Sequence, residues 1–253
     1  MPAAAKSSAD AGGGSKGSQA APEIELFFVD LLRGMPALDA EEARTPRLSD
    51  ADRARADAMA EVEAKRLWRA SRIATRIVLE RLGGAALRRI AFEVEPGGRP
   101  ILRGGPHFSI SHTGGAALIA VSNSTPVGVD LEQESRALKM SAERRSRVVR
   151  AAADLGTLTP LSAEQDRDVL AAWVQLEAAA KALGIGIGRL LTEAGVVGGR
   201  EAVAATGSQR RLTVRALAIE TGYLAGIAAE RLPDVLSVEA FPHERLDTFL
   251  RGQ

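Results

Sequence analysis

Cysteine is absent from this chain of 253 residues, and its absence excludes several chemistries at once. The protein has no disulfide, no thiolate metal site and no cysteine nucleophile. A cytoplasmic enzyme fits this composition best, although an exported protein can also lack cysteine. Long hydrophobic runs are missing too, since no apolar stretch approaches the roughly 20 residues of a membrane span, and the N-terminus has no apolar segment typical of a secretory signal. We therefore expect no membrane partner.

An excess of charge of either sign is also lacking. The chain has 33 basic and 32 acidic residues, for a formal net charge of +1. A general nucleic-acid binder normally shows a net basic surface, so we expect no nucleic-acid partner, although a local basic pocket for a phosphate-rich small molecule remains compatible. Lysine is scarce and stands only at positions 6, 16, 65, 139 and 181. A lysine inside a dense motif of an arginine-rich chain hints at a required ammonium, but drift explains it equally well.

The order of the expected elements gives the fold class. Residues 1–22 are rich in Ala, Gly and Ser and predict a disordered tail. Hydrophobic periodicity and turn residues then predict strand, helices, strands, helices and strands again. The helices are expected from 51, over 58–82, over 141–152 and over 162–183, and the strands over 23–29, 90–94, 108–111, 116–122, 127–131, 212–219, 223–229 and 235–241. This α+β order, repeated once, predicts two similar subdomains, 23–125 and 126–253.

Two helix starts carry recognisable capping signals. Ser49 precedes the first of these helices, and Ser162 stands three residues before Gln165 in the pattern of a capping box.

Asp130 and Glu132 form the first candidate site. They are two residues apart on an expected strand, so both carboxylates point to one face, while Val129 and Leu131 face the core. Two such charges repel unless a cation lies between them, and carboxylate oxygens suit Mg²⁺ or Mn²⁺. The pair is also compatible with scattered acids at a surface strand end.

Glu177 and Lys181 form the second candidate. With Trp173 they are spaced four apart on an expected helix, so the three side chains make one stripe. Such a Glu–Lys pair is usually an exposed helix pair. The tryptophan, which prefers burial, and the flanking alanines, which permit close approach, both weaken that explanation.

The segment 107–115 contains two of the three histidines. His112 stands at a strand end before Gly114 and Gly115, where small residues leave backbone N–H groups open to a phosphate. A lone loop histidine is more often structural, and the spacing does not favour zinc.

These segments together resemble the 4′-phosphopantetheinyl transferases, of the longer type that activates peptide and polyketide synthetases. The matching motifs, in order, are 98–100, 108–113, 128–132, and Trp173 with Glu177, Lys181 and Gly184, and the arginine-bearing helix at 66–76 and the strand at 222–228 also fit. The resemblance covers about residues 23–245. It implies two similar α+β halves related by a pseudo-two-fold axis, in a chain that acts as a monomer.

The resemblance also implies a reaction and roles for the site residues. The enzyme would transfer 4′-phosphopantetheine from coenzyme A to a serine of an apo acyl or peptidyl carrier protein. Asp130, Glu132 and Glu177 would hold Mg²⁺ against the pyrophosphate, and Glu177 would accept the serine proton. The coenzyme phosphates would be contacted by Lys181, Arg72, Arg99, Ser111 and His112.

Several positions depart from the family pattern. Ser109 stands where Asn is usual, Leu176 and Ile185 replace lysines, and 147–153 lacks an aromatic patch. The segment 147–153 is expected to help dock the carrier, so its change affects the expected partner more than the chemistry. These departures also leave open a binding-only relative of weak activity, and the same acids would serve a magnesium-dependent phosphoester hydrolase.

Overall fold

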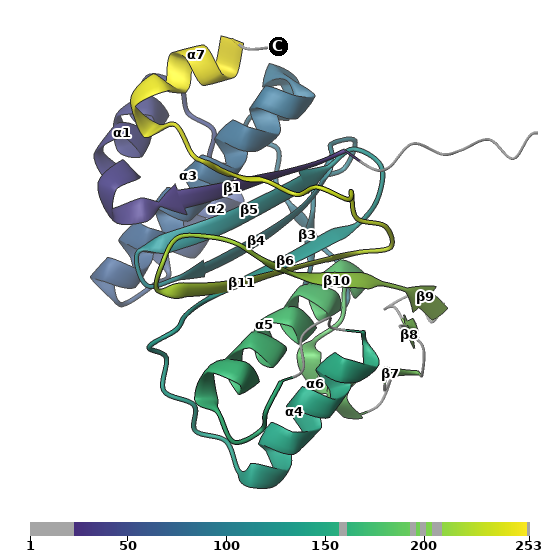
Figure 1. The fold of residues 1–253 in the computed structure, drawn as a ribbon. Coiled ribbons are helices and arrows are strands. Elements are labelled where there is room, and N and C mark those ends of the chain that lie inside the picture. Colours follow the sequence, from purple (N-terminus) through teal and green to yellow (C-terminus); the bar gives the residue numbers. More distant parts are fainter. Residues whose placement is uncertain (1–22, 157–160, 193–195, 198–200, 204–208, 252–253) are drawn as a thin grey trace, which may run out of the picture.

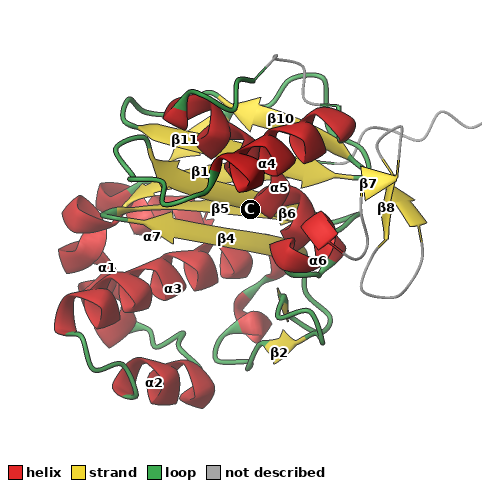
Figure 2. Cartoon of the chain, turned by 90° about the horizontal axis from the view of Figure 1, so that it is seen from below, coloured by secondary structure: helices red, strands yellow, loops and turns green. Residues whose placement is uncertain are grey.

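The computed structural model describes residues 23–251, apart from 157–160, 193–195, 198–200 and 204–208. It has a mixed α+β fold, which confirms the predicted fold class. Two sheets pack face to face at the centre, and helices cover both outer faces (Figures 1 and 2). The tail predicted over residues 1–22 lies outside the described residues.

The first sheet has the strand order β12-β1-β5-β4. These strands are β1 (Ile24–Asp30), β4 (His107–Thr113), β5 (Ala116–Ser122) and β12 (Val238–Ala240). Neighbouring strands are antiparallel, except that β12 runs parallel to β1. Its outer face is covered by α1 (Leu31–Arg44), α3 (Val62–Gly83) and α7 (Leu246–Arg251), and residues such as Phe27, Ile73 and Leu246 share one core there.

The second sheet has the order β10-β11-β6 and is antiparallel. Its strands are β6 (Val127–Gln133), β10 (Thr213–Leu217) and β11 (Tyr223–Ala229), and its outer face is covered by α4 (Ala142–Asp154) and α5 (Asp166–Leu183). The inner faces of the two sheets share a third core, which includes Leu118, Val129 and Ile227.

Short elements complete the described fold. They are α2 (Asp50–Asp57), η1 (Ala85–Leu87), β2 (Glu93–Val94), β3 (Pro100–Ile101), α6 (Ile187–Thr192), β7 (Val196–Val197), β8 (Glu201–Val203), β9 (Gln209–Arg211) and η2 (His243–Arg245).

Most expected elements are present, and two strands, β5 and β11, have the predicted bounds. Ser49 caps α2 in a capping box with Asp52, as its position predicted. The capping box predicted at Ser162 is wrong, because α5 begins only at Asp166 and its cap residue Gln165 makes no side-chain capping bond. The last expected strand is shorter than predicted, since β12 covers only Val238–Ala240.

Helix α1 was not predicted from the sequence. Gly34 and Pro36 lie inside it, and both residues normally weaken a helix interior. Two features overcome them. Asp30 caps the helix by accepting a hydrogen bond from the Arg33 N–H at 2.9 Å, and the buried Leu31 and Leu38 fix it against the sheet.

Helix α5 packs unusually close to β6. A side chain at Gly128 would begin 2.0 Å from the carbonyl oxygen of Ala178 and 2.4 Å from the nitrogen of Ala182, so only glycine fits there. This glycine and the two alanines let the helix backbone lie on the strand. The approach brings Glu177 and Lys181 over the part of β6 that carries Asp130.

The two ends of the described chain meet in the first sheet. β12 pairs with β1, and α7 packs beside α3, although both follow the second sheet in sequence. The division into 23–125 and 126–253 therefore stays a prediction. Among the described residues, no helix has the length and hydrophobicity required to cross a membrane.

Candidate active site

Asp130 lies on β6, where the second sheet meets β4 of the first, and the residue is 5% exposed. Its oxygen Oδ1 accepts hydrogen bonds from the Ser111 hydroxyl and the Lys181 ammonium, each at 2.7 Å. Its other oxygen, Oδ2, is buried and has no hydrogen-bond partner within the described part of the chain. A buried carboxylate oxygen without a donor is unfavourable unless a ligand meets it.

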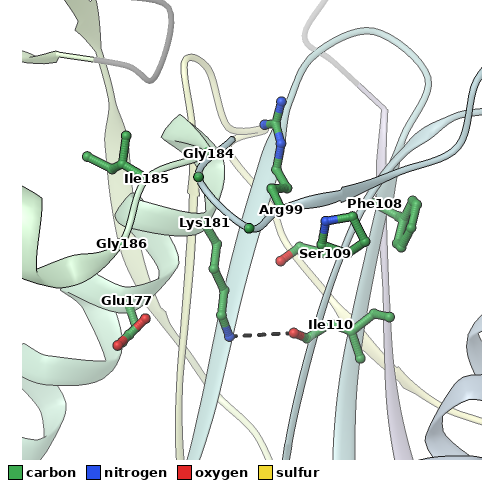
Figure 3. Close-up of a pocket in the computed structure, with 12 residues that line it drawn as sticks. Arg99, Phe108, Ser109, Ile110, Glu177, Lys181, Gly184, Ile185 and Gly186 are labelled. Carbon is green, nitrogen blue, oxygen red and sulfur yellow. Dashed lines mark hydrogen bonds between the residues drawn. The ribbon is translucent and has the colours of Figure 1, made fainter. Parts of the chain in front are cut away.

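Lys181 extends from the last turn of α5 to the same place. Besides Asp130, its ammonium donates to the backbone carbonyl of Val129 at 3.0 Å. It also donates to the backbone carbonyl of Ile110 at 3.5 Å (Figure 3). Ile110 belongs to β4 and Val129 to β6, so this one ammonium links the edge strands of the two sheets.

Glu132 has two partners. Its carboxylate accepts a hydrogen bond from the Thr113 hydroxyl at 3.3 Å and forms an ion pair with Arg136. Burial raises the pKa of Glu132, Arg136 opposes this increase, and the nearby charge of Asp130 adds to it.

Glu177 lies one helical turn before Lys181 on α5 (Figure 3). It makes no hydrogen bond or ion pair with any residue that the structure describes. Burial raises its pKa, and the charge of Asp130 raises it further, while Lys181 lowers it. A carboxylate with a raised pKa and no fixed partner is suited to accept a proton.

No group of three or more His, Cys, Asp or Glu side chains in the described residues is arranged to hold a metal ion. Lys181 bonds Asp130, and Arg136 forms an ion pair with Glu132. The predicted ligands are therefore not gathered around one point. Mg²⁺ commonly binds through one or two carboxylates together with waters and substrate phosphates rather than in an all-protein cage. The unpartnered Oδ2 of Asp130 and the unpaired Glu177 fit that mode.

Two of the predicted phosphate-binding residues lie near these acids. Burial lowers the pKa of His112, and the charges of Lys181 and Arg72 lower it further, so these two cations lie near a histidine that is neutral at pH 7. Arg72 packs against the rings of Trp68 and Phe92, and burial lowers its pKa to about 10. Its Nη1 is buried without a hydrogen-bond partner in the described chain. Nη1 is therefore a free donor that suits an anion.

Arg99 makes contacts other than the predicted ones to phosphate. It donates two hydrogen bonds to Glu95, at 2.8 and 3.0 Å, and one to the carbonyl of Ala182 at 2.9 Å. It therefore fixes the β2–β3 hairpin to the end of α5. Gly97 at the tip of this hairpin touches the backbone of Gly184, where a side chain would begin 1.5 Å from the carbonyl oxygen.

A cavity of about 250 Å³ opens between this hairpin and α5. Pro100, Phe108 and Ile110 give it an apolar wall, and Glu177 and Lys181 lie at its side (Figure 3). An apolar cleft with a few polar groups is typical of a small-molecule site.

The structure thus brings Asp130, Glu177, Lys181, Ser111 and His112 together and adds residues that were missed. Thr113, Arg136 and Ser109 contact the site or its strands, and Ser109 accepts a hydrogen bond from the Val129 N–H at 3.0 Å. The alternation of Ser109, Ser111 and Thr113 along one strand was the available signal.

Comparison with models of known protein families and with curated proteins finds no match to this chain.

Proposed function

We propose that this chain is a Mg²⁺-dependent transferase that moves 4′-phosphopantetheine from coenzyme A to a serine of an apo acyl or peptidyl carrier protein. The observation that supports this proposal best is an imbalance of charge. Three acids, Asp130, Glu132 and Glu177, interact there with two cations, Lys181 and Arg136. The carboxylate of Glu177 and Oδ2 of Asp130 lack partners in the described chain. Such an imbalance suits a cation, and the neighbouring Arg72 and His112 suit phosphates.

In this reaction the serine oxygen attacks the phosphorus that bears the pantetheine group. The bond from this phosphorus to the bridging oxygen breaks, 3′,5′-ADP leaves with that electron pair, and the serine proton passes to Glu177. The raised pKa of Glu177 makes it a better proton acceptor than an ordinary carboxylate near neutral pH.

The cationic side chains act on the phosphates. Lys181 stabilises negative charge on the transferring phosphoryl group, and the unpartnered Nη1 of Arg72 binds a phosphate of the coenzyme. Asp130 and Glu177, with Glu132 when Arg136 releases it, would hold Mg²⁺. When bound, this ion neutralises charge that develops on the pyrophosphate.

The proposal includes two similar halves related by a pseudo-two-fold axis and divided near residue 125. In support, each main sheet carries one long helix on its outer face, α3 on the first and α5 on the second. Arg72 comes from α3 and His112 from β4, Asp130 comes from β6, and Glu177 and Lys181 come from α5, so one chain supplies both sides of the site. We therefore propose that the protein is a monomer. We also propose a cytoplasmic location, which the absence of cysteine favours.

The test uses the purified protein, coenzyme A, Mg²⁺ and a panel of apo carrier proteins, followed by mass spectrometry of each carrier. We expect at least one carrier to gain the mass of one phosphopantetheine group, and no gain when EDTA replaces Mg²⁺. Breakdown of coenzyme A without an adduct would assign a hydrolase instead. Coenzyme A binding with neither product would assign a binding protein, and either result contradicts the transferase.

A further inference from the structure

Strands β4 and β6 lie side by side, yet each is the edge strand of its own sheet. The side-chain bonds from β4 to β6 occur in the same order along both strands, so the strands run in the same direction. Among the described residues, no backbone ladder joins them. The backbone groups of such edges need partners, and here side chains supply them. The N–H of Val129 donates to Ser109, and the carbonyl of Val129 accepts from Lys181.

Three hydroxyl groups of β4 contact β6 at successive positions along the two strands. Ser109 fixes the backbone of Val129, Ser111 donates to Asp130 at 2.7 Å, and Thr113 donates to Glu132 at 3.3 Å. Because the strands run the same way, successive hydroxyls meet successive parts of β6. Ser111 and Thr113 therefore contact the two candidate metal ligands of β6.

The contact with Ser111 determines how the Asp130 carboxylate is turned. Oδ1 is held from two sides, by the hydroxyl of Ser111 and by the ammonium of Lys181. Two fixed donors on one oxygen set the plane of the carboxylate and leave Oδ2 as the free atom. The proton of the buried Ser111 hydroxyl is already donated, so this hydroxyl is not a free donor for a coenzyme phosphate.

We propose that Ser111 is a positioning residue for Asp130: it holds the carboxylate in the orientation that leaves Oδ2 for a divalent cation. Thr113 has the same relation to Glu132. The inference rests on the proposed function, because it assigns a role within the same site. It differs from the role that the family resemblance implied, in which Ser111 contacts phosphate.

The test compares Ser111→Ala with the wild-type chain by titrating Mn²⁺ in the presence of coenzyme A and measuring free Mn²⁺ by electron paramagnetic resonance. Loss of a partner that orients a metal ligand typically weakens metal binding about 10- to 100-fold, and we expect a loss of at least about 10-fold. Where transfer is measured, we expect kcat to fall while KM for coenzyme A changes less than about twofold. Ser111→Thr retains the hydroxyl and is expected to restore both.

Ser109→Ala is the matched control. Ser109 lies on the same strand, is similarly buried at 5% exposure, and bonds only backbone. We expect this variant to unfold at lower urea concentration but to bind Mn²⁺ within about twofold of the wild type.

Three results would overturn the inference: wild-type chain that binds no Mn²⁺, Ser111→Ala that binds as tightly as wild type, or Ser109→Ala that loses as much affinity as Ser111→Ala. Weakened Mn²⁺ binding in Ser111→Ala together with no transfer by the wild type supports the positioning role and rejects the proposed transferase.

Discussion

Two clusters of buried charge in this molecule differ in how completely they are paired. In the cluster between α2 and α3, Arg76 bonds Asp52, and Arg47 bonds Glu80. In the cluster between β6 and α5, three acids face two cations: Lys181 bonds Asp130 and Arg136 pairs with Glu132. Glu177 and Oδ2 of Asp130 have no partner in the described chain. A paired buried charge supports the fold, whereas an excess of one sign is tolerated when a ligand of the other sign binds.

Arg72 lies at the border between these two clusters. Its Nε lies 3.4 Å from Oδ1 of Asp52, yet its Nη1 is buried without a partner in the described residues. The comparison therefore predicts that Arg72 binds an anion, while its neighbour Arg76 on the same helix supports the fold.

The largest effect is expected at Glu177. Glu177→Gln keeps the shape of the side chain but removes the proton acceptor, so transfer should fall by about 1000-fold, within the range of general-base catalysis. The initial rate of carrier modification, followed by mass spectrometry, checks this. Glu134→Gln, which loses only the exposed pair with Arg167, is the control and should retain the rate.

The same variant tests whether the ionised carboxylate of Glu177 destabilises the fold near neutral pH. The folded-state pKa of Glu177 is raised, so its stabilising contribution is present below the ordinary pKa and is lost as pH rises through the folded-state value. At pH 7.5 without metal, Glu177→Gln should be at least as stable as wild type in urea. Near-normal transfer by this variant would remove Glu177 from the mechanism.

The next effect compares the two arginines of α3 in stability. Arg76→Gln leaves Asp52 buried without its main partner, and loss of one member of a buried pair lowers the free energy of unfolding by about 3 kcal/mol. Urea denaturation of this variant beside Arg72→Gln measures the difference. Equal losses in the two variants would contradict the distinction drawn between them.

Arg72→Gln should act instead on binding. Loss of a charged donor to a phosphate corresponds to about a tenfold increase in KM for coenzyme A, with a smaller change in kcat. Steady-state kinetics with varied coenzyme A checks this. An unchanged KM would show that the free Nη1 is not a ligand contact.

The smallest effect is expected at His243, whose Nδ1 is also buried without a partner in the described chain. Burial lowers the pKa of His243 below its ordinary value of 6.5, so the stability that depends on its neutral form is present above pH 6.5 and is lost as pH falls. His243→Phe should reduce the loss of stability between pH 7.5 and 5.5 and leave transfer unchanged. Urea midpoints at both pH values check this, and an equal loss in the variant would contradict it.

Local patterns predicted much of the fold. β5 and β11 are short apolar runs that lie between turn residues such as Gly, Pro and Ser, so both strands were visible with their bounds. Helix α1 was missed because its stability comes from packing of Leu31 and Leu38 on the sheet, which local propensity does not show. The late start of α5 was missed because Ser162 carries a capping pattern without the capping bond.

The site was predictable in pairs but not as a whole. Strand spacing related Asp130 to Glu132, and helix spacing related Glu177 to Lys181. The contact of Ser111 with Asp130 joins two strands of different sheets and depends on how those sheets pack. Likewise, the bonds of Arg99 to Glu95 and Ala182 arise only when the hairpin reaches α5.

The central claim is that the unpaired acids of the β6–α5 cluster hold Mg²⁺ together with coenzyme A. Isothermal titration of coenzyme A with and without Mg²⁺ measures the coupling between the two ligands directly. We expect Mg²⁺ to tighten coenzyme A binding by about tenfold or more in the wild type and to have little effect in Asp130→Asn. Equal affinities for coenzyme A with and without Mg²⁺ in the wild type would contradict the account.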